Sequence, residues 1–279
     1  MKRNNQCERD AKMAADELRN KFNLKNNSNS NPIGIILGTG WGGKLSLNNS
    51  STPVPFKDVC GLKHLTTGPE GHKREFQHGF VEDKEVIILN GRIHLNENPT
   101  DSNIPKWVRL QVEILMQLGV KKLIITCAAG ALPESGFETG ELAVIDSFMS
   151  LLGPPMPLFA GEFISPEDIL SEELIQIALK QNIVYGPIKK ACYAMLLGPD
   201  FEGRKKDKQA LRMLGADIVG MSVRPETCIA ALYPDTQVLA VAFISNDSVE
   251  THSHEENIKR ANQSSEKLGV FLENIIKEI

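Results

Sequence analysis

The stretch 198–226 has residue types and spacing suited to binding a flat, polar ligand. An aromatic residue, Phe201, and a carboxylate, Glu202, follow an apolar run, and a Gly-Met-Ser turn with Met221 and Ser222 comes after a helical stretch. An aromatic ring packs on a flat heterocycle, a carboxylate accepts from ring N–H groups, and a hydroxyl binds a sugar or phosphate. A purine nucleoside is a ligand with these features.

A glycine-rich turn follows the first apolar run. The segment 33–43 reads IGIILGTGWGG, in which Thr39 and neighbouring N–H groups could converge on an anion. Gly38, Gly40 and Gly43 also fit the dinucleotide fingerprint, but that turn should open a helix, and here two prolines follow in a poor helical pattern. From these residues alone there are three interpretations of the segment: it binds phosphate, it forms a tight structural turn, or it binds a dinucleotide.

Two basic residues follow the next apolar run. Arg92 and His94 alternate, so an extended segment would direct both to one side. The planar fork of arginine matches phosphate oxygens. His72 lies in a glycine-rich segment, residues 66–79, that resembles a mobile loop. It is either a ligand contact or an exposed loop histidine.

Two further segments place small or amide residues after apolar runs. Ala128 lies in TCAAG, where small residues allow close backbone approach to a ligand or tight strand–helix packing. Asn246 offers both a donor and an acceptor, or simply forms a turn. His252 and His254 lack the spacing of a metal-binding helical pair, so we expect a solvated turn and no metal site.

Composition narrows the classes of protein. The chain has 279 residues, 41% hydrophobic, with a net charge of −4, which disfavours general nucleic-acid binding. It has no long apolar run for a membrane span and no apolar leader. Five cysteines lie scattered without CxxC pairs, which is typical of reduced thiols and predicts a cytoplasmic protein.

The alternation of apolar runs with amphipathic stretches predicts an α/β fold. We expect a helix over 5–22 and an Asn/Ser-rich linker, together forming residues 1–32, and one domain over residues 33–279. The predicted strands are Ile33–Leu37, Val86–Leu89, Leu123–Cys127, Leu142–Ile145, Tyr193–Leu197, Ile218–Gly220 and Val238–Ile244. The predicted helices are Trp107–Gly119, Glu167–Lys180, Lys205–Gly215, Pro225–Leu232 and Glu255–Ile279. The candidate residues mostly follow strands, at the edge where α/β sheets bind ligands.

Together these segments resemble the trimeric, low-molecular-mass purine nucleoside phosphorylases. The markers occur in family order over Ile33–Ile279: LGTGWGG, GHKREFQHG, GRIHLNE, ITCAAGAL, GPDFEGRKKDKQALRMLGADIVGMSVRPE, and ISND followed by KRAN. The resemblance implies a single α/β domain with a mixed, partly barrel-like sheet flanked by helices. It also implies a homotrimer that converts a purine nucleoside and phosphate into free base and (deoxy)ribose 1-phosphate, without a cofactor.

The resemblance also assigns roles to individual residues. It implies catalytic roles for His94, Glu202 and Asn246, with Glu97 steadying the phosphate site. The implied phosphate contacts are Thr39, His72, Arg92, His94, the backbone N–H of Ala128, and Ser222. The implied base and sugar contacts are Phe201, Glu202, Met221, Asn246 and Gln263.

The base-recognition pair favours 6-oxopurines. Glu202 can accept from the N1 proton of hypoxanthine or guanine, which adenine lacks, and Asn246 can donate to purine N7. The related methylthioadenosine phosphorylases typically lack this glutamate and carry Asp at the asparagine position. The alternatives are methylthioadenosine phosphorylase activity, a non-catalytic nucleoside-binding protein, and, more remotely, a nicotinamide-dependent oxidoreductase.

The chain departs from the family pattern on the sugar side. Asn96 stands where a tyrosine is frequent, Cys127 replaces an asparagine, and Gln263 replaces a histidine. Asp247 follows Asn246 where a lysine or a neutral residue is common. The segment between Gly153 and Leu170 is shortened, and Phe163, or else Phe159, is the candidate to close a neighbouring subunit's sugar pocket.

Overall fold

The computed structural model describes residues 5–24, 31–42, 45–63, 73–98, 100–151, 153–159, 161–181, 186–197, 205–247 and 254–279. Three candidate site residues, His72, Phe201 and Glu202, lie outside these ranges. None of the described helices has the length and apolar character needed to cross a bilayer.

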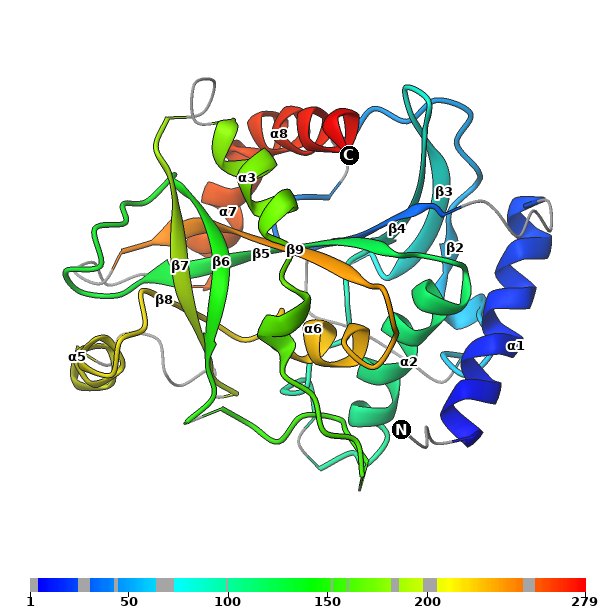
Figure 1. Cartoon of the computed structure of the whole chain (residues 1–279), viewed down its shortest axis with the longest axis horizontal. Coiled ribbons are helices and arrows are strands. Elements are labelled where there is room, and N and C mark those ends of the chain that lie inside the picture. Colours follow the sequence, from blue (N-terminus) through cyan, green and yellow to red (C-terminus); the bar gives the residue numbers. More distant parts are fainter. Residues whose placement is uncertain are drawn as a thin grey trace.

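A mixed nine-stranded sheet organises the described chain (Figure 1). Its order is β2-β3-β4-β1-β5-β8-β7-β6-β9, and β9 also pairs with β5, so the last five strands close into a barrel. This confirms the expected mixed, partly barrel-like sheet. The strands are β1 (Ile33–Leu37), β2 (Val54–Pro55), β3 (Glu75–Val81), β4 (Lys84–Asn90), β5 (Lys122–Ala131), β6 (Leu142–Met149), β7 (Ile188–Met195), β8 (Ile218–Gly220) and β9 (Gln237–Asn246).

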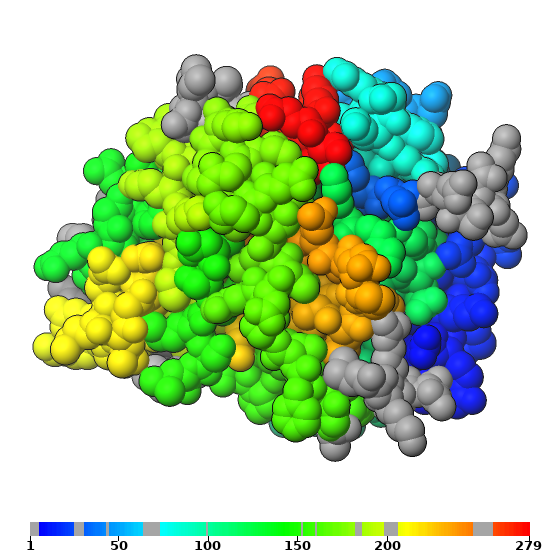
Figure 2. Space-filling model, in the orientation of Figure 1, coloured from blue at the N-terminus to red at the C-terminus, as the bar shows by residue number. Residues whose placement is uncertain are grey.

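Helices cover both faces of the sheet (Figure 1). The helices α3, α7 and α8 pack on one face and α2 and α6 on the other, with α1 against α2. In the space-filling view the segment between β6 and α3 forms much of the visible surface, and α1 lies at one edge (Figure 2). The helices are α1 (Asn5–Phe22), η1 (Phe56–Asp58), α2 (Ile104–Gln117), η2 (Pro166–Ile169), α3 (Glu172–Lys180), α5 (Lys205–Met213), α6 (Arg224–Ala230), α7 (His254–Gln263) and α8 (Ser265–Glu278).

The central strands are apolar throughout because both of their faces are buried. In β1, Ile33, Ile35 and Leu37 join the core beneath α3 and α8. Ile36 joins the core beneath α1, α2 and α6. The same alternation in β4, β5 and β9 fixes strand register, because a shift by one residue would exchange the two faces.

The predicted helix ends are confirmed at Gly119 and Gly215, which adopt φ of 99° and 103°, the left-handed backbone of a terminating glycine. The stretch 167–180 instead forms η2 and α3, because Leu170 bridges to β9 and Ser171 caps α3. The C-terminal stretch forms two helices, α7 and α8, rather than one.

A strand, β3, also occupies the end of the segment expected to be a mobile loop. Its sequence EFQHGFV mixes polar and apolar residues, and its pairing with β2 and β4 holds it in the sheet. The expectation of a loop was therefore wrong for residues 75–79.

Candidate active site

The ends of five strands bring most of the described candidate residues to one region of the sheet. The parallel strands β1, β4, β5 and β9 end at the same edge. Thr39 and Arg92 follow β1 and β4, Asn246 is the last residue of β9, and Ala128 lies near the end of β5. The strand β8 pairs with the last residues of β5, so Ser222 comes to this edge as well.

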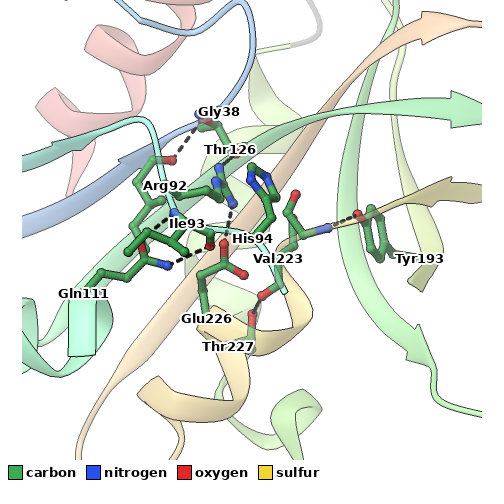
Figure 3. Close-up of polar contacts among 12 residues, drawn as sticks. Gly38, Arg92, Ile93, His94, Gln111, Thr126, Tyr193, Val223, Glu226 and Thr227 are labelled. Carbon is green, nitrogen blue, oxygen red and sulfur yellow. Dashed lines mark hydrogen bonds and ion pairs between the residues drawn. The ribbon is translucent and has the colours of Figure 1, made fainter. Parts of the chain in front are cut away.

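Arg92 is the buried centre of this region (Figure 3). Its side chain is fully buried, and Nη1 lies 2.8 Å from Oε1 of Glu226 while Nη2 donates to the carbonyl oxygen of Thr126. A Cβ on Gly38 would lie 2.9 Å from Nη2, so only glycine allows this approach. The sequence predicted that the planar guanidinium of Arg92 would bind phosphate oxygens. In the structure, its Nη1 and Nη2 each already contact an oxygen atom of the protein.

A side-chain amide fixes the backbone between the two basic residues. Gln111 of α2 is fully buried; its Oε1 accepts from the N–H of Ile93 at 2.8 Å, and its Nε2 donates to the Ile93 carbonyl at 3.1 Å (Figure 3). This pair of hydrogen bonds replaces a missing strand neighbour. Gln111 therefore sets the direction of the chain from Arg92 to His94.

His94 is held by the carboxylate of Glu97. Oε1 of Glu97 accepts from the N–H of His94 at 2.7 Å and lies 3.5 Å from the imidazole Nδ1, while Oε2 accepts from Arg74. Burial opposes ionisation of Glu97, but the hydrogen bonds from His94 and the charge of Arg74 outweigh it and lower the pKa of this carboxyl. An ionised Glu97 fixes the backbone and the ring of His94.

Ser222 is held in a strained turn. The carbonyl of Ser222 accepts from the N–H of Arg224 at 2.8 Å, and Val223 between them has φ 72° and ψ −55°, the geometry of a rare γ-turn. The phenol oxygen of buried Tyr193 accepts from the N–H of Ser222 at 3.2 Å. Gly220 leaves room for it, since a Cβ there would lie 2.3 Å from that oxygen. A β-branched residue at positive φ indicates strain of the kind found at functional sites.

Asn246 ends β9 with its side chain 6% exposed. Its Oδ1 accepts from the hydroxyl of Ser245 at 3.1 Å, and its Nδ2 donates to the carbonyl of Asp247 at 3.4 Å. A Cβ on Gly130 would lie 2.8 Å from Nδ2, so this glycine provides the space for the amide. An amide nitrogen carries two hydrogens, so Nδ2 can still donate one hydrogen bond to a ligand atom.

The other described candidates differ in their surroundings. Thr39 and Ala128 are both half-buried. Thr39 lies in a turn that is tied to β5, because the indole of Trp41 donates to the carbonyl of Cys127, the residue before Ala128, at 2.9 Å. Burial raises the pKa of Cys127 to about 12, so this thiol stays neutral and is no nucleophile. Gln263 is exposed at the end of α7, and none of the described contacts joins it to the other candidates.

The structure shows the surroundings of Asn96, one of the residues that depart from the family pattern on the sugar side. Asn96 is half-buried, and its Nδ2 lies 3.5 Å from Sδ of Met221. This contact links the loop after Arg92 to the turn that carries Ser222. Asn96 therefore helps to position Met221, although it is shorter than a tyrosine.

Three supporting residues were missed from the sequence, namely Glu226, Gln111 and Tyr193. Each is separated from its partner along the chain: Glu226 lies 134 positions from Arg92, Tyr193 lies 29 from Ser222, and Gln111 lies 18 from Ile93. The available signal was a charged or polar residue within an otherwise apolar face, as at Gln111 and Glu226 in the buried faces of α2 and α6.

Comparison with known proteins identifies the family. A model described as the phosphorylase superfamily matches residues 32–277. The chain belongs to the phosphorylase superfamily. It is also 30% identical over 240 residues to purine nucleoside phosphorylase 1 of Geobacillus stearothermophilus, which covers 84% of this chain and 82% of that protein. Its place among the purine nucleoside phosphorylases, and hence among enzymes, follows from this match.

Solved structures agree with this assignment. Isoform 2 of the purine nucleoside phosphorylase of Schistosoma mansoni, in complex with cytosine and ribose-1-phosphate, superimposes with a TM-score of 0.80 at 26% identity over 97% of this chain and 96% of that one. A Schistosoma mansoni purine nucleoside phosphorylase in complex with inosine gives the same TM-score at 25% identity, with the same coverage. The sheet and the helices described above are those of this family.

Proposed function

We propose that the protein catalyses the reversible phosphorolysis of 6-oxopurine nucleosides, yielding the free base and (deoxy)ribose 1-phosphate. The observation that carries the proposal is the buried Arg92, fixed by Glu226 and Thr126 at the strand edge where Thr39, His94 and Ser222 also lie. A buried guanidinium is suited to binding an anion, because its planar N–H groups match phosphate oxygens. The related Schistosoma enzyme is described with ribose-1-phosphate bound, which is a product of this reaction.

Phosphate would be both a nucleophile and an electrostatic stabiliser. We assign it to Thr39, Arg92, His94, the N–H of Ala128, and Ser222, with His72 nearby. Cleavage of the bond between N9 and C1′ develops positive charge on the sugar and negative charge on the purine. Phosphate held beneath the sugar would stabilise the positive charge on the sugar. Nδ2 of Asn246 would donate to N7 and so stabilise the negative charge on the purine.

Glu202 gives the proposed preference among bases. A carboxylate that faces the base would pair with the N1 proton of a 6-oxopurine but would be left without a donor opposite adenine, at a cost of about 1–3 kcal/mol. Phe201 and Met221 would pack on the nucleoside. Since related structures are described with adenosine as well as inosine, the proposal for this chain rests on Glu202 and Asn246 rather than on the fold.

We also propose that the enzyme acts as a homotrimer in which Phe163 closes the neighbouring sugar pocket. Phe163 is 88% exposed. Phe159, the other candidate, packs under the guanidinium of Arg109 at 4.7 Å, and Arg109 is paired with Glu162 at 2.6 Å. Phe159 is thus engaged within its own chain, which favours Phe163.

A substrate panel tests the base preference. We expect turnover of inosine and guanosine, and far slower turnover of adenosine and methylthioadenosine, when each is assayed with and without phosphate. Glu202→Ala should lower kcat/KM for inosine about tenfold or more, because the N1 proton loses its acceptor. Unchanged inosine kinetics in this variant would remove Glu202 from the base site, and preferred turnover of methylthioadenosine would replace the proposed substrate class.

A further inference from the structure

Arg74 occupies a backbone position suited to glycine. It lies directly before β3 with φ of 53°, in the left-handed region that side chains rarely adopt. Its carbonyl accepts from the N–H of Phe56 at 2.8 Å, which holds this backbone in place. An arginine at such a position therefore needs a compensating role for its side chain.

The side chain of Arg74 is buried beside the proposed phosphate site. The residue is 7% exposed, and Nη2 donates to Oε2 of Glu97, whose own side chain is 9% exposed. Within the described part of the chain, Nε and Nη1 of Arg74 are buried and have no hydrogen-bond partner. A purely structural arginine would be expected to pair more of its donors, because unpaired buried donors are costly.

The contacts of Glu97 lead from Arg74 to His94. One carboxylate oxygen accepts from Arg74, and the other accepts from the N–H of His94 at 2.7 Å and faces its Nδ1 at 3.5 Å. The site therefore contains two buried arginine–glutamate pairs, since Arg92 pairs with Glu226 in the same way.

We propose that Arg74 is a positioning residue of the phosphate site. It keeps Glu97 ionised and oriented, and Glu97 in turn fixes the backbone and the ring of His94 toward the anion. Loss of Arg74 would leave Glu97 with one fewer donor and free to turn away from His94. The inference rests on the proposed function, because His94 is taken as a phosphate contact.

Two substitutions separate this role from a structural one. Arg74→Gly removes the side chain but relieves the left-handed backbone, which offsets part of the stability lost with the buried ion pair to Glu97, so its melting temperature should fall less than that of a variant that keeps a side chain at this position. Arg74→Met keeps a long side chain without charge or donors. Both should raise KM for phosphate about tenfold, since each removes a buried, charge-assisted hydrogen bond from Glu97. KM for inosine should not change, and Arg74→Lys should restore part of the phosphate affinity.

Asp235→Gly is the matched control. Asp235 has φ of 59° in the exposed turn between α6 and β9, so its replacement relieves similar backbone strain far from the site. It should leave KM for phosphate unchanged. Wild-type phosphate KM in both Arg74→Gly and Arg74→Met, with an active parent enzyme, would overturn the role of Arg74 alone. A parent protein without phosphate-dependent turnover would instead refute the proposed function.

Discussion

Arg92→Met is expected to abolish phosphorolysis and to lower the free energy of unfolding by about 3–5 kcal/mol, because it leaves Glu226 charged and buried without its partner. The side chains of Arg92 and Glu226 are 1% and 2% exposed, so solvent cannot replace the lost interaction. The two effects are measured by urea denaturation and by the rate of hypoxanthine release from inosine.

A double variant separates the two losses. Arg92→Met combined with Glu226→Met replaces the ion pair by apolar side chains, which should recover most of the stability. Activity should stay absent, because the phosphate would still lack its central guanidinium. Recovery of phosphorolysis in the double variant would show that Arg92 acts only on the fold, and full stability of the single variant would contradict the buried pair.

Asn246→Asp is expected to lower kcat/KM for inosine by about 10²–10³-fold, the usual effect of losing a donor to charge that develops in the transition state. The substituted carboxylate has no N–H to offer and would repel the electron-rich purine. Because it can accept from a 6-amino group, the ratio of adenosine to inosine turnover should rise. Steady-state kinetics with both nucleosides measure this change.

Ser245→Ala is the control for Asn246. It removes the hydroxyl that lies 3.1 Å from Oδ1 but keeps the amide itself, so it should cost much less activity. If Asn246→Asp retained wild-type inosine kinetics, Asn246 would have no part in stabilising the leaving base.

The central strands could be predicted because each is marked by a short, continuous run of apolar residues. Apolar runs such as Ile33–Leu37 and Val238–Ile244 coincide with β1 and with most of β9. β3 could not be predicted in this way, since His78 and Gln77 interrupt its apolar pattern and the strand depends on pairing with β2 and β4. The closure of the barrel by β5 and β9 likewise depends on residues more than a hundred positions apart in the chain.

The candidate site was predictable in its location but not in its supports. Strand ends located Arg92 and Asn246, because ligands gather where parallel strands end. The residues that support the site come from other segments: Glu226 of α6 pairs with Arg92, Gln111 of α2 holds the backbone of Ile93, and Arg74, directly before β3, pairs with Glu97. A sequence shows the type of such a residue but not which buried charge or backbone group it contacts.

The dependence of inosine cleavage on phosphate tests the central claim most directly. The purified protein is mixed with inosine in the presence and absence of inorganic phosphate, and hypoxanthine and ribose 1-phosphate are measured together. We expect both products in equal amounts with phosphate, and neither without it. Release of hypoxanthine with free ribose in the absence of phosphate, or no release under either condition, would contradict the account.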